Sequence, residues 1–564
     1  MLSERRTYCL WKRLGLVLVV LAIASAGCAK ANDTGHKSTE LSRLMADYVF
    51  DEVNGVCNAL NGATGASDYS GADHSAVIQA AVDAAGERGV FEFRPGTYTI
   101  RTPLRPKSFQ TWTFSSGAVF EPAGDNSIMT IEDVEQLSTI GTLRIIDPQM
   151  DIDGAIFESG GIQTDETAAA TDDAPNDMNL LTTDAGLGDC YYWGNDEQFN
   201  ALVLDIGTAG DGLWLGVYEY WDSVDGSWRE ISDCRCDTYD RIASQFTRSG
   251  SCHVFFKMLP PHWGKKTILD RELYWIRFRV TGITEMKTQP KGNRAWVHRT
   301  TTKPAIYVDD MEFSQLDSIW IRGYYNAIDM NGAHGTRENT WKDIYFHVRN
   351  EGLSLETQCH DNHFLQIFGK GVSPYDFGHA TGCGIRLEMT GTKGGNSFES
   401  LQLIDMDQGI HAPGATEVWF DTLLVDNARN EAVNILGGCE RLFFDRIWAS
   451  SSGDGLVLSG SAEDPLDDVV SINQIYARLN SNHGVYIKHN IRRINIHFIS
   501  VTENGHGFHI EGPDVSEVYI NTLFSFKNTA GVDSSGGTSE IFCDHADIDD
   551  SCDLSGFTSI NGSV

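Results

Sequence analysis

Residues 326–356, NAIDMNGAHGTRENTWKDIYFHVRNEGLSLE, contain one full period of the repeat that decides the fold of this chain. A small residue followed by an apolar one opens the stretch at Ala327-Ile328 and returns 25 residues later at Gly352-Leu353. The same signature recurs at Gly384-Ile385, Gly409-Ile410, Ala432-Val433, Gly455-Leu456, Gly484-Val485, Gly507-Phe508 and Gly531-Val532. Repetition at steps of 23 to 32 residues is typical of solenoids, in which each repeat forms one turn and stacks on the next.

A second pattern within the repeats predicts how each turn is built. Two apolar residues stand three apart around a polar one, as in LDSIWI (316–321). Side chains alternate along a straight strand, so both apolar residues point inward only if the chain bends at the polar residue. The pattern recurs in FESLQL (398–403), FDRIWA (444–449), INQIYA (472–477) and INTLFS (520–525). With one further strand before the bend, each repeat is predicted to form a turn of a parallel β-solenoid.

The stretch HSAVIQAAVDAAGERGVFEFRPGTYTI (74–100) resembles the opening of pectate-lyase-superfamily proteins. The resemblance implies an all-β fold: a right-handed, single-stranded parallel β-helix with a short N-terminal capping helix, for which Asp73 or Ser75 is a suitable N-cap. That superfamily includes lyases, hydrolases, epimerases and phage tailspikes. The fold therefore points to a carbohydrate-active protein but leaves the reaction open.

The first 28 residues have the features of an export signal. Basic residues between 5 and 13 precede the apolar run LGLVLVVLAIA (14–24), which is too short for a comfortable membrane span. The following Ser25-Ala26-Gly27-Cys28 resembles a bacterial lipobox, with Ser25 in place of the usual large aliphatic residue. The resemblance implies lipid attachment at Cys28 and an exported outer-membrane lipoprotein, facing the periplasm or the cell surface. Ordinary secretion is the alternative.

The net charge of −35 excludes nucleic acid as a partner, because no basic cluster is available to neutralise phosphates. An acidic surface also repels anionic polysaccharides at long range. A uronic-acid substrate would therefore need local cations, either Arg and Lys side chains or bound Ca²⁺.

Ten cysteines remain after Cys9 and Cys28, in a chain expected to enter an oxidising compartment. Cys359 and Cys383 are 24 residues apart, about one solenoid turn, which predicts a disulfide between stacked turns. Cys543 and Cys552 could close the C-terminal end in the same way. The other pairings stay open, because connectivity cannot be deduced from spacing.

The solenoid pattern is interrupted by a segment of different composition. Seven of the thirteen tryptophans fall within it, together with alternating runs such as ALVLDIG and YWIRFRVTG. Such alternation predicts an inserted antiparallel β-sandwich, and the segment resembles jelly-roll-like modules found beside catalytic or adhesive domains. One interpretation is a carbohydrate-binding module whose exposed tryptophan rings stack on sugars, but most of these tryptophans are expected in the sandwich core. Trp221 and Trp228 are the better candidates for exposure. The predicted domains are a signal peptide (1–28), a tether (29–48), a cap with the first turns (49–157), the insert (158–300) and the main β-helix (301–564).

Stacked repeats convert sequence positions into columns in space, about 4.8 Å apart from turn to turn. The residue after the apolar position of each signature is predicted to point outward from the first strand. This column comprises Tyr307, Asp329, Ser354, Arg386, His411, Asn434, Val457, Tyr486 and His509. Two residues further on, the outward positions include Asp309, Asn331, Glu356, Glu388, Lys488 and Glu511. The family resemblance implies that substrate lies along this face.

The central part of this face contains groups suited to two reactions. A lyase needs a base, for which Arg386 or His411 is proposed, and Ca²⁺ held by Glu356, Glu388 or Asp329. A hydrolase needs two carboxyls, and Glu356 with Glu388, one turn apart, suits the short separation of a retaining enzyme. We favour a lyase acting on a uronic-acid-containing glycan, because Arg386 and His411 are neighbours. A non-catalytic, glycan-binding or adhesive protein is the alternative, in which the charges form only a solvated face.

The substrate-binding residues are predicted around this centre. They are Tyr307, Asp309, Asn434, Tyr486 and Lys488 on the strands, with Tyr375 and His379 on the long loop GKGVSPYDFGHATG (369–382). Two rival columns remain. One is acidic, on the second strand, at Glu399, Asp421 and Asp445; the other is aromatic, on the third strand, and includes Trp320, Tyr345, Trp448 and Tyr476.

Overall fold

The computed structural model describes residues 46–563 apart from 148–149, 173, 232–233, 237–244, 257–261, 300–302, 334, 372–379, 381, 390–393, 467–468, 513, 536–540 and 549–557. The predicted positions Cys28, Tyr375 and His379 lie outside the described residues. None of the helices in the described ranges is both long and apolar enough to cross a membrane.

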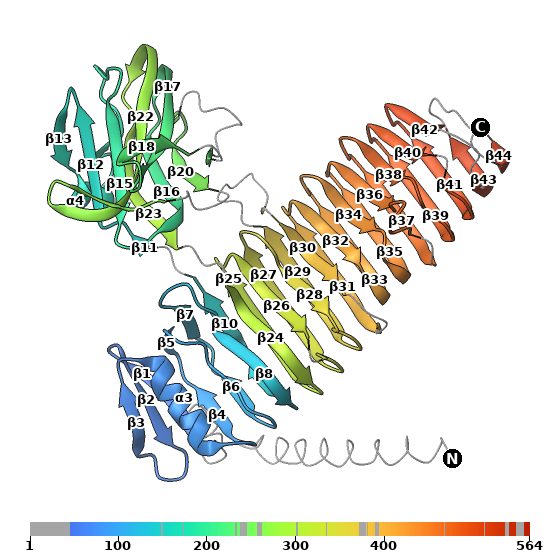
Figure 1. Cartoon of the computed structure of the whole chain (residues 1–564), viewed down its shortest axis with the longest axis horizontal. Helices are drawn as coiled ribbons and strands as arrows, with labels where there is room; N and C mark the ends of the chain where they lie inside the picture. Colours follow the sequence, from blue (N-terminus) through green and yellow to red (C-terminus); the bar gives the residue numbers. More distant parts are fainter. Residues whose placement is uncertain are drawn as a thin grey trace, which may run out of the picture.

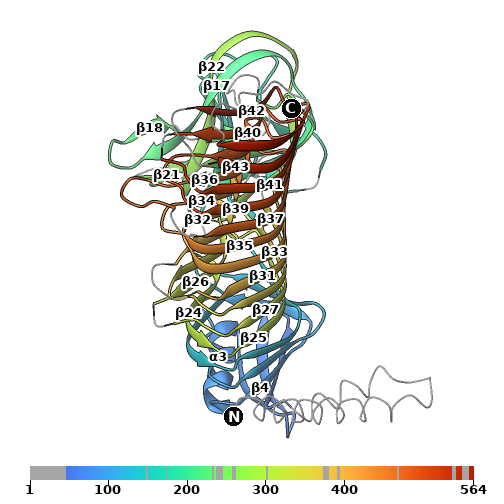
Figure 2. The ribbon, with the colours of Figure 1, turned by 90° about the vertical axis from the view of Figure 1, so that its right-hand side faces the viewer.

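The predicted solenoid is present as a parallel β-helix, whose strands stack in chain order along one axis (Figures 1 and 2). The first strand of each turn contributes to an 11-stranded parallel sheet, here called the first-strand sheet. Its strands are β8 (Met129–Glu135), β24 (Pro304–Glu312), β26 (Asn326–Gly332), β28 (Leu353–Thr357), β30 (Cys383–Glu388), β32 (Gln408–Gly414), β34 (Glu431–Leu436), β36 (Asp454–Ser459), β38 (His483–Ile487), β40 (His506–Glu511) and β42 (Ala530–Ser535).

The second and third strands of each turn form one longer, bent strand. Ser318 and Asp343 lie at two of the bends with φ of 56° and 52°, so the side chains on either side, such as Leu316 and Ile319, both point into the core, as predicted. The bent strands are β25 (Gln315–Arg322), β27 (Thr340–Val348), β29 (His363–Gly371), β31 (Asn396–Ile404), β33 (Thr416–Asp426), β35 (Glu440–Ser450), β37 (Val470–Arg478), β39 (Ile494–Thr502), β41 (Val518–Phe526) and β43 (Ile541–Ile548), followed by β44 (Ser559–Ser563).

The N-terminal end is closed by helix α3 (His74–Ala85) and an antiparallel meander. Asp73 is the N-cap, since its carboxylate accepts a hydrogen bond from the Ala76 amide at 3.3 Å. The helix buries Val77, Ile78, Ala81 and Val82 over the open end of the coil. The meander and first turns comprise β1 (Tyr48–Val53), β2 (Val56–Asn61), β3 (Ser67–Gly71), β4 (Val90–Phe93), β5 (Gly96–Ile100), β6 (Thr111–Phe114), β7 (Ala118–Pro122), β9 (Ser138–Gly141) and β10 (Leu143–Ile146).

The insert is an antiparallel β-sandwich, as expected, but its boundary differs from the prediction. The predicted boundary at residue 157 placed residues 154–157 in the β-helix, yet β12 (Gly154–Ser159) pairs antiparallel with β13 (Ile162–Asp165) and β15 (Cys190–Asn195) inside the sandwich. The coil stops at β10 and resumes at β24, with Met129 paired to Ile306 and Leu143 to Ile319. The short apolar run of β12, residues 154–157, fits a buried strand in either sheet, and only its pairing partners distinguish them.

The two sheets of the sandwich contain six and seven strands. Trp193, Trp214, Trp263 and Trp275 are buried, which agrees with the expected core role. Trp221 is half-buried beneath the Lys266 ammonium group, 3.4 Å from the ring centroid, and Arg277 covers Trp228 at 4.3 Å. The remaining elements are β11 (Met150–Asp151), α4 (Thr167–Thr171), β14 (Met178–Asn179), β16 (Phe199–Thr208), β17 (Asp211–Asp222), β18 (Ser227–Glu230), β19 (Cys234–Cys236), β20 (Gly250–Phe256), β21 (Lys265–Ile268), β22 (Arg271–Thr288) and β23 (Lys291–Arg299).

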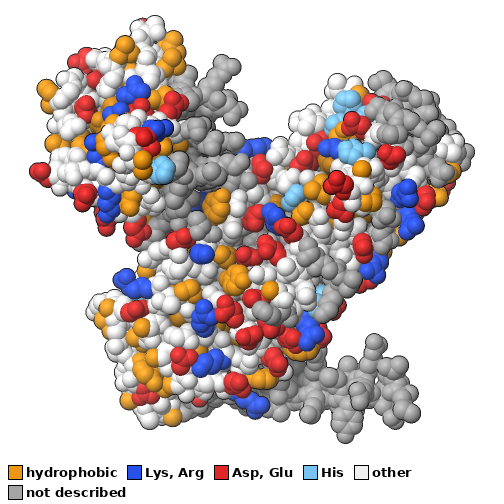
Figure 3. Space-filling view, viewed as in Figure 1, with side chains coloured by type: hydrophobic (Ala, Val, Ile, Leu, Met, Phe, Trp, Pro, Cys, Tyr) orange, Lys and Arg blue, Asp and Glu red, His pale blue; other side chains and the backbone are white. Residues whose placement is uncertain are grey.

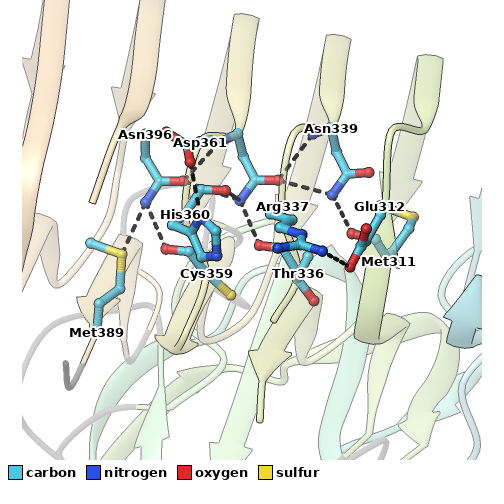
Figure 4. Close-up of polar contacts among 11 residues, drawn as sticks. Met311, Glu312, Thr336, Arg337, Asn339, Cys359, His360, Asp361, Met389 and Asn396 are labelled. Atoms are coloured by element: carbon cyan, nitrogen blue, oxygen red, sulfur yellow. Dashed lines mark hydrogen bonds and ion pairs between the residues drawn. The ribbon is translucent and has the colours of Figure 1, made fainter. Parts of the chain in front are cut away.

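Buried asparagines tie successive turns together at the corners of the coil. Asn339 donates to the Met311 carbonyl at 2.7 Å and to the Asn362 side chain at 2.9 Å, and Asn362 in turn donates to Asn396 at 3.1 Å (Figure 4). A second ladder joins Asn480, Asn504 and Asn528 with side-chain hydrogen bonds of 3.0 Å. These amides supply partners for backbone groups that the sheets do not reach.

The predicted Cys359–Cys383 disulfide is wrong, because both are free, buried thiols. Cys359 lies between β28 and β29 and donates to the Met330 carbonyl at 3.1 Å, whereas Cys383 opens β30. The turn that separates them is 32 residues long from Gly352 to Gly384, so a spacing of 24 places the two thiols at different corners. Cys543 is also free, and Cys552 lies outside the described residues.

Candidate functional site

The predicted outward column of the first-strand sheet is present at every position. Strand pairing places Tyr307, Asp329, Ser354, Arg386, His411, Asn434, Val457, Tyr486, His509 and also Asp533 opposite one another in successive turns. Asn331, Glu356 and Glu388 form the adjacent column. The intervening residues, such as Ile328, Met330, Ile385 and Leu387, are buried, so the period-two alternation sets which side chains face outward.

Arg386 is the centre of a charged cluster on this face. Its Nε donates to Glu388 at 2.9 Å, Nη2 makes a second bond to the same carboxylate, and Nη1 reaches Glu351 at 3.4 Å. Burial lowers the pKa of Arg386, because it disfavours the charged guanidinium. The contacts with Glu388 and Glu351 have the larger effect, so the pKa of Arg386 is raised overall. We call Asp329, Glu351, Glu356, Arg386, Glu388 and His411 the Arg386 cluster.

Asp329 is the most perturbed carboxyl of the cluster. Burial, followed by the charges of Glu356 and Glu351, raises its pKa to about 6, although Arg386 opposes the shift. Its Oδ1 is buried and has no hydrogen-bond partner among the described residues. A carboxyl with such a pKa exchanges its proton close to neutral pH, which is the property of a general acid or base.

Glu351 and His411 complete the surroundings of Arg386. Burial raises the pKa of Glu351 despite its ion pair with Arg386. Burial and the charge of Arg386 lower the pKa of His411, so its imidazole is neutral at pH 7. The buried Nδ1 of His411 makes no hydrogen bond within the described part of the chain. A neutral, half-buried imidazole beside a fixed cation is suited to accept a proton.

Glu351 was not predicted, because it precedes β28 and belongs to neither outward column. Its place at a strand edge next to Arg386 follows from the loop that links β27 to β28. The Arg386–Glu388 ion pair had a sequence signal, since residues two apart on a strand share a face. That pair also limits the predicted calcium site, because a cation at Glu356 and Glu388 would have to displace Arg386 from Glu388.

The predicted substrate-binding residues fall into two groups. Tyr307, Asp309 and Asn434 flank the Arg386 cluster along the sheet. The Tyr307 hydroxyl accepts a hydrogen bond from Asn331 at 3.2 Å. Asp309 is half-buried, and Asn434 is 7% exposed. Tyr486 and Lys488 lie towards the C-terminal end, where the Lys488 ammonium group lies 4.8 Å from the Tyr486 ring centroid. The structure therefore does not bring the second pair to the same centre.

The rival acidic column on the second strand is solvated. Glu399, Asp421 and Asp445 are exposed, and Asp445 accepts a hydrogen bond from Asn473 at 2.7 Å. Exposed carboxylates of this kind are well hydrated and lack the burial that tunes a catalytic acid. They serve as controls for the half-buried carboxyls of the Arg386 cluster.

The aromatic column on the third strand consists of stacked, partly exposed rings. Tyr345 stacks on Trp320 at 5.7 Å and on Phe368 at 5.3 Å between centroids. A second run contains Trp448 and Tyr476 at 6.1 Å, with Trp448 40% exposed. Such rings suit either sugar stacking or coverage by another surface.

No protein-family model matches the chain, and no curated protein sequence matches it. Among solved structures, a protein described as a glycoside hydrolase is similar over 81% of this chain and 89% of its own, with 9% identity and a TM-score of 0.31. PfbA, a surface adhesin of Streptococcus pneumoniae, is similar over 87% and 89%, with 10% identity and a TM-score of 0.31.

The Gp54 tailspike of Acinetobacter baumannii bacteriophage AP22, solved with a capsular saccharide, is similar over 87% of this chain and 74% of its own, with 9% identity and a TM-score of 0.23. At these identities and TM-scores, the similarities say nothing about the reaction of this chain.

Proposed function

We propose that this protein is a polysaccharide-degrading enzyme and that the Arg386 cluster is its active site, acting as a glycoside hydrolase. The supporting observation is Asp329, whose pKa of about 6 suits a general acid that protonates the glycosidic oxygen. Glycosidases use one carboxyl of raised pKa for this step and a second, ionised carboxylate for the attack on the sugar.

Glu356 is proposed as the second carboxylate. It lies one strand over and two residues on from Asp329, and its Oε1 accepts a hydrogen bond from the Ser354 hydroxyl at 3.2 Å. Strand spacing and rise per residue place these two backbone positions roughly 8 Å apart. Carboxyls about 6.5–9.5 Å apart are typical of inverting enzymes, so side chains that keep this backbone separation would leave room for a water molecule and favour inversion.

The charge of the cluster favours a neutral glycan over a uronate. Four carboxyls surround a single guanidinium, and Arg386 is already paired with Glu388 and Glu351. A substrate carboxylate would meet repulsion there unless a cation were bound. This differs from the sequence-based preference for a lyase, in which Arg386 was a candidate base; a guanidinium with a raised pKa does not release its proton.

A lyase remains the second candidate because of His411. Its neutral imidazole, with Nδ1 unpartnered among the described residues, is a plausible base for C5 of a uronate. This mechanism requires Ca²⁺ at Glu356 and Glu388 to offset the acidic surroundings, and Glu388 must then leave Arg386. The calcium dependence separates the two candidates.

The test is a screen of the purified protein against neutral and uronate-containing polysaccharides, with and without a calcium chelator. We expect new reducing ends without the ultraviolet absorbance of unsaturated sugars, unaffected by the chelator and absent in Glu356→Gln. Unsaturated products that require calcium would favour the lyase. Saturable binding with neither product would identify a glycan-binding or adhesive protein.

A further inference from the structure

A cluster of histidines lies on the first-strand sheet, well separated from the Arg386 cluster. His509 is four strands beyond His411 in the outward column, a distance of about 19 Å at the usual strand spacing. Figure 3 shows histidine side chains gathered over the C-terminal turns of the coil, among acidic ones. We call His483, His506, His509 and Asp533 the histidine cluster.

Two histidines of one strand, His506 and His509, are both partly exposed although they are three residues apart. His506 opens β40, and the buried residues Gly507 and Phe508 separate it from His509, which is again on the outer face. The strand pairings set His483 opposite His506 and His509 opposite Asp533. The imidazoles of His483 and His506 therefore lie 5.0 Å apart, and those of His506 and His509 lie 5.8 Å apart, between ring centroids.

Asp533 lies between the two imidazoles of β40. Its Oδ1 forms a short contact with Nδ1 of His509, and its Oδ2 lies 3.9 Å from Nδ1 of His506. Nδ1 of His506 is buried and makes no hydrogen bond within the described residues. One ligand atom from each of His506, His509 and Asp533 lies within 4.8 Å of the other two.

We propose that His506, His509 and Asp533 form a binding site for a divalent transition-metal ion, with Zn²⁺ as the expected ion. Two imidazole nitrogens and one carboxylate oxygen suit zinc, which takes such ligands at about 2.0–2.2 Å. The three ligand atoms already lie within 4.8 Å of one another, so only small side-chain rotations are needed to bind one ion. Calcium and magnesium prefer sites built from oxygen ligands alone, so they are disfavoured.

His483 and Asp454 support this site from the preceding turn. Nδ1 of His483 contacts Asp454 Oδ1 at 2.7 Å, and its ring packs against His506. A carboxylate partner of this kind fixes the orientation of an imidazole. His483 therefore holds the His506 ring in place, and a water molecule or a substrate oxygen would fill the fourth position on the metal.

A bound ion would join β40 to β42 through side chains on both strands. Because the ion binds the folded protein and not the separated turns, it is expected to stabilise the C-terminal end of the coil. This role is independent of the reaction proposed for the Arg386 cluster.

The proposal is tested by titrating Zn²⁺ into the chelator-treated full chain, using calorimetry and metal analysis after dialysis. We expect the wild type to bind one equivalent of Zn²⁺. This equivalent should be lost in His509→Ala and in Asp533→Asn, and retained in His497→Ala. His497 is a matched control, because it is exposed on β39 and hydrogen-bonded to Asn521. Circular dichroism and the metal-free Tm verify that each variant folds.

Co²⁺ provides the second readout, because cysteines are the competing ligands in this chain. Bound to two imidazoles and a carboxylate, Co²⁺ gives visible ligand-field bands without a thiolate charge-transfer band. Those bands are expected to vanish in His509→Ala. Wild-type protein that binds no Zn²⁺, variants that keep the full equivalent, or a charge-transfer band would each overturn the site.

Discussion

Asp329 occupies an outward position of the coil and is nevertheless half-buried, close to the other charged side chains of the Arg386 cluster. The carboxyl therefore meets two carboxylates in a poorly hydrated place, which costs folding free energy at neutral pH. A residue that destabilises the fold where it stands is typical of a functional site. Asp329 therefore fits a catalytic role better than the role of an ordinary surface ion pair.

We predict that Asp329→Asn stabilises the protein at neutral pH. The folded-state pKa of about 6 exceeds the unfolded value near 4, so the folded state binds its proton more tightly, and the free energy of unfolding falls as pH rises from about 4 to 6. Removing the charge is expected to raise the free energy of unfolding by about 1–3 kcal/mol near pH 8 and to change it little near pH 4. Urea unfolding at both pH values measures this, with exposed Asp421→Asn as the control. A variant less stable than wild type near pH 8 would contradict the shift.

The same carboxyl sets the expected pH dependence of turnover. If Asp329 acts as the general acid, it has to be protonated, so kcat/KM should decline about tenfold per pH unit above its pKa near 6. A pH–rate profile on the substrate found in the screen measures this limb. An activity that rises through pH 6 to 8 would instead favour a base such as His411.

The sequence predicted which residues face outward but not how they pair. Period-two alternation and the repeat placed Asp329, Glu356, Arg386 and His411 on one face, and strand register confirms it. Glu351 was missed because it stands in a corner between strands, where no alternation applies. The burial of Asp329 could not be predicted either, since it depends on side-chain positions in several turns.

At the level of the strands and corners, the buried asparagine ladders give the coil its regular stacking. Asn504 accepts hydrogen bonds from the backbone and side chain of Asn480, and it donates to Ala477 and Asn528. No apolar residue can replace these bonds, because each amide serves two neighbouring turns. The bend and signature motifs predicted the strands. The asparagine ladders could not be predicted from the sequence, because they depend on how the turns stack.

Asn504→Ala is expected to destabilise the protein by several kcal/mol, because it leaves more than one buried polar group without a partner, at about 1–3 kcal/mol each. Asn473→Ala is the matched control, since Asn473 is exposed and its side chain donates to Asp445; this variant should lose less than about 1 kcal/mol of unfolding free energy. Chemical denaturation measures the unfolding free energy of both variants. Equal losses in Asn504→Ala and Asn473→Ala would refute the role of the ladder.

For the whole molecule, the main feature is a coil that continues across a large insertion. The boundary prediction failed there because the apolar run of β12 fits a solenoid strand equally well, while its partners β13 and β15 belong to the sandwich. Just before the insert, Asp147 forms a buried ion pair with Arg349, Oδ2 to Nη2 at 3.2 Å. This pair anchors the end of β10 to the main part of the coil.

Asp147→Ala is expected to cost about 3–5 kcal/mol, because it leaves a buried guanidinium without its carboxylate. The double variant Asp147→Leu with Arg349→Met should regain most of that loss, since no charge is then buried. Thermal unfolding of the three proteins tests the coupling. If the double variant is as unstable as the single one, the ion pair is not the source of the effect.

We propose that the Arg386 cluster, and no other face of the coil, carries the reaction. The turnover of Asp329→Asn and Glu356→Gln is compared with that of Glu399→Gln combined with Asp421→Asn, on one substrate and after verifying the fold of each. We expect kcat to fall about 10²–10⁴-fold in the first two variants, with the second-strand variant close to wild type. Normal turnover in Asp329→Asn and Glu356→Gln, with loss in the second-strand variant, would contradict it.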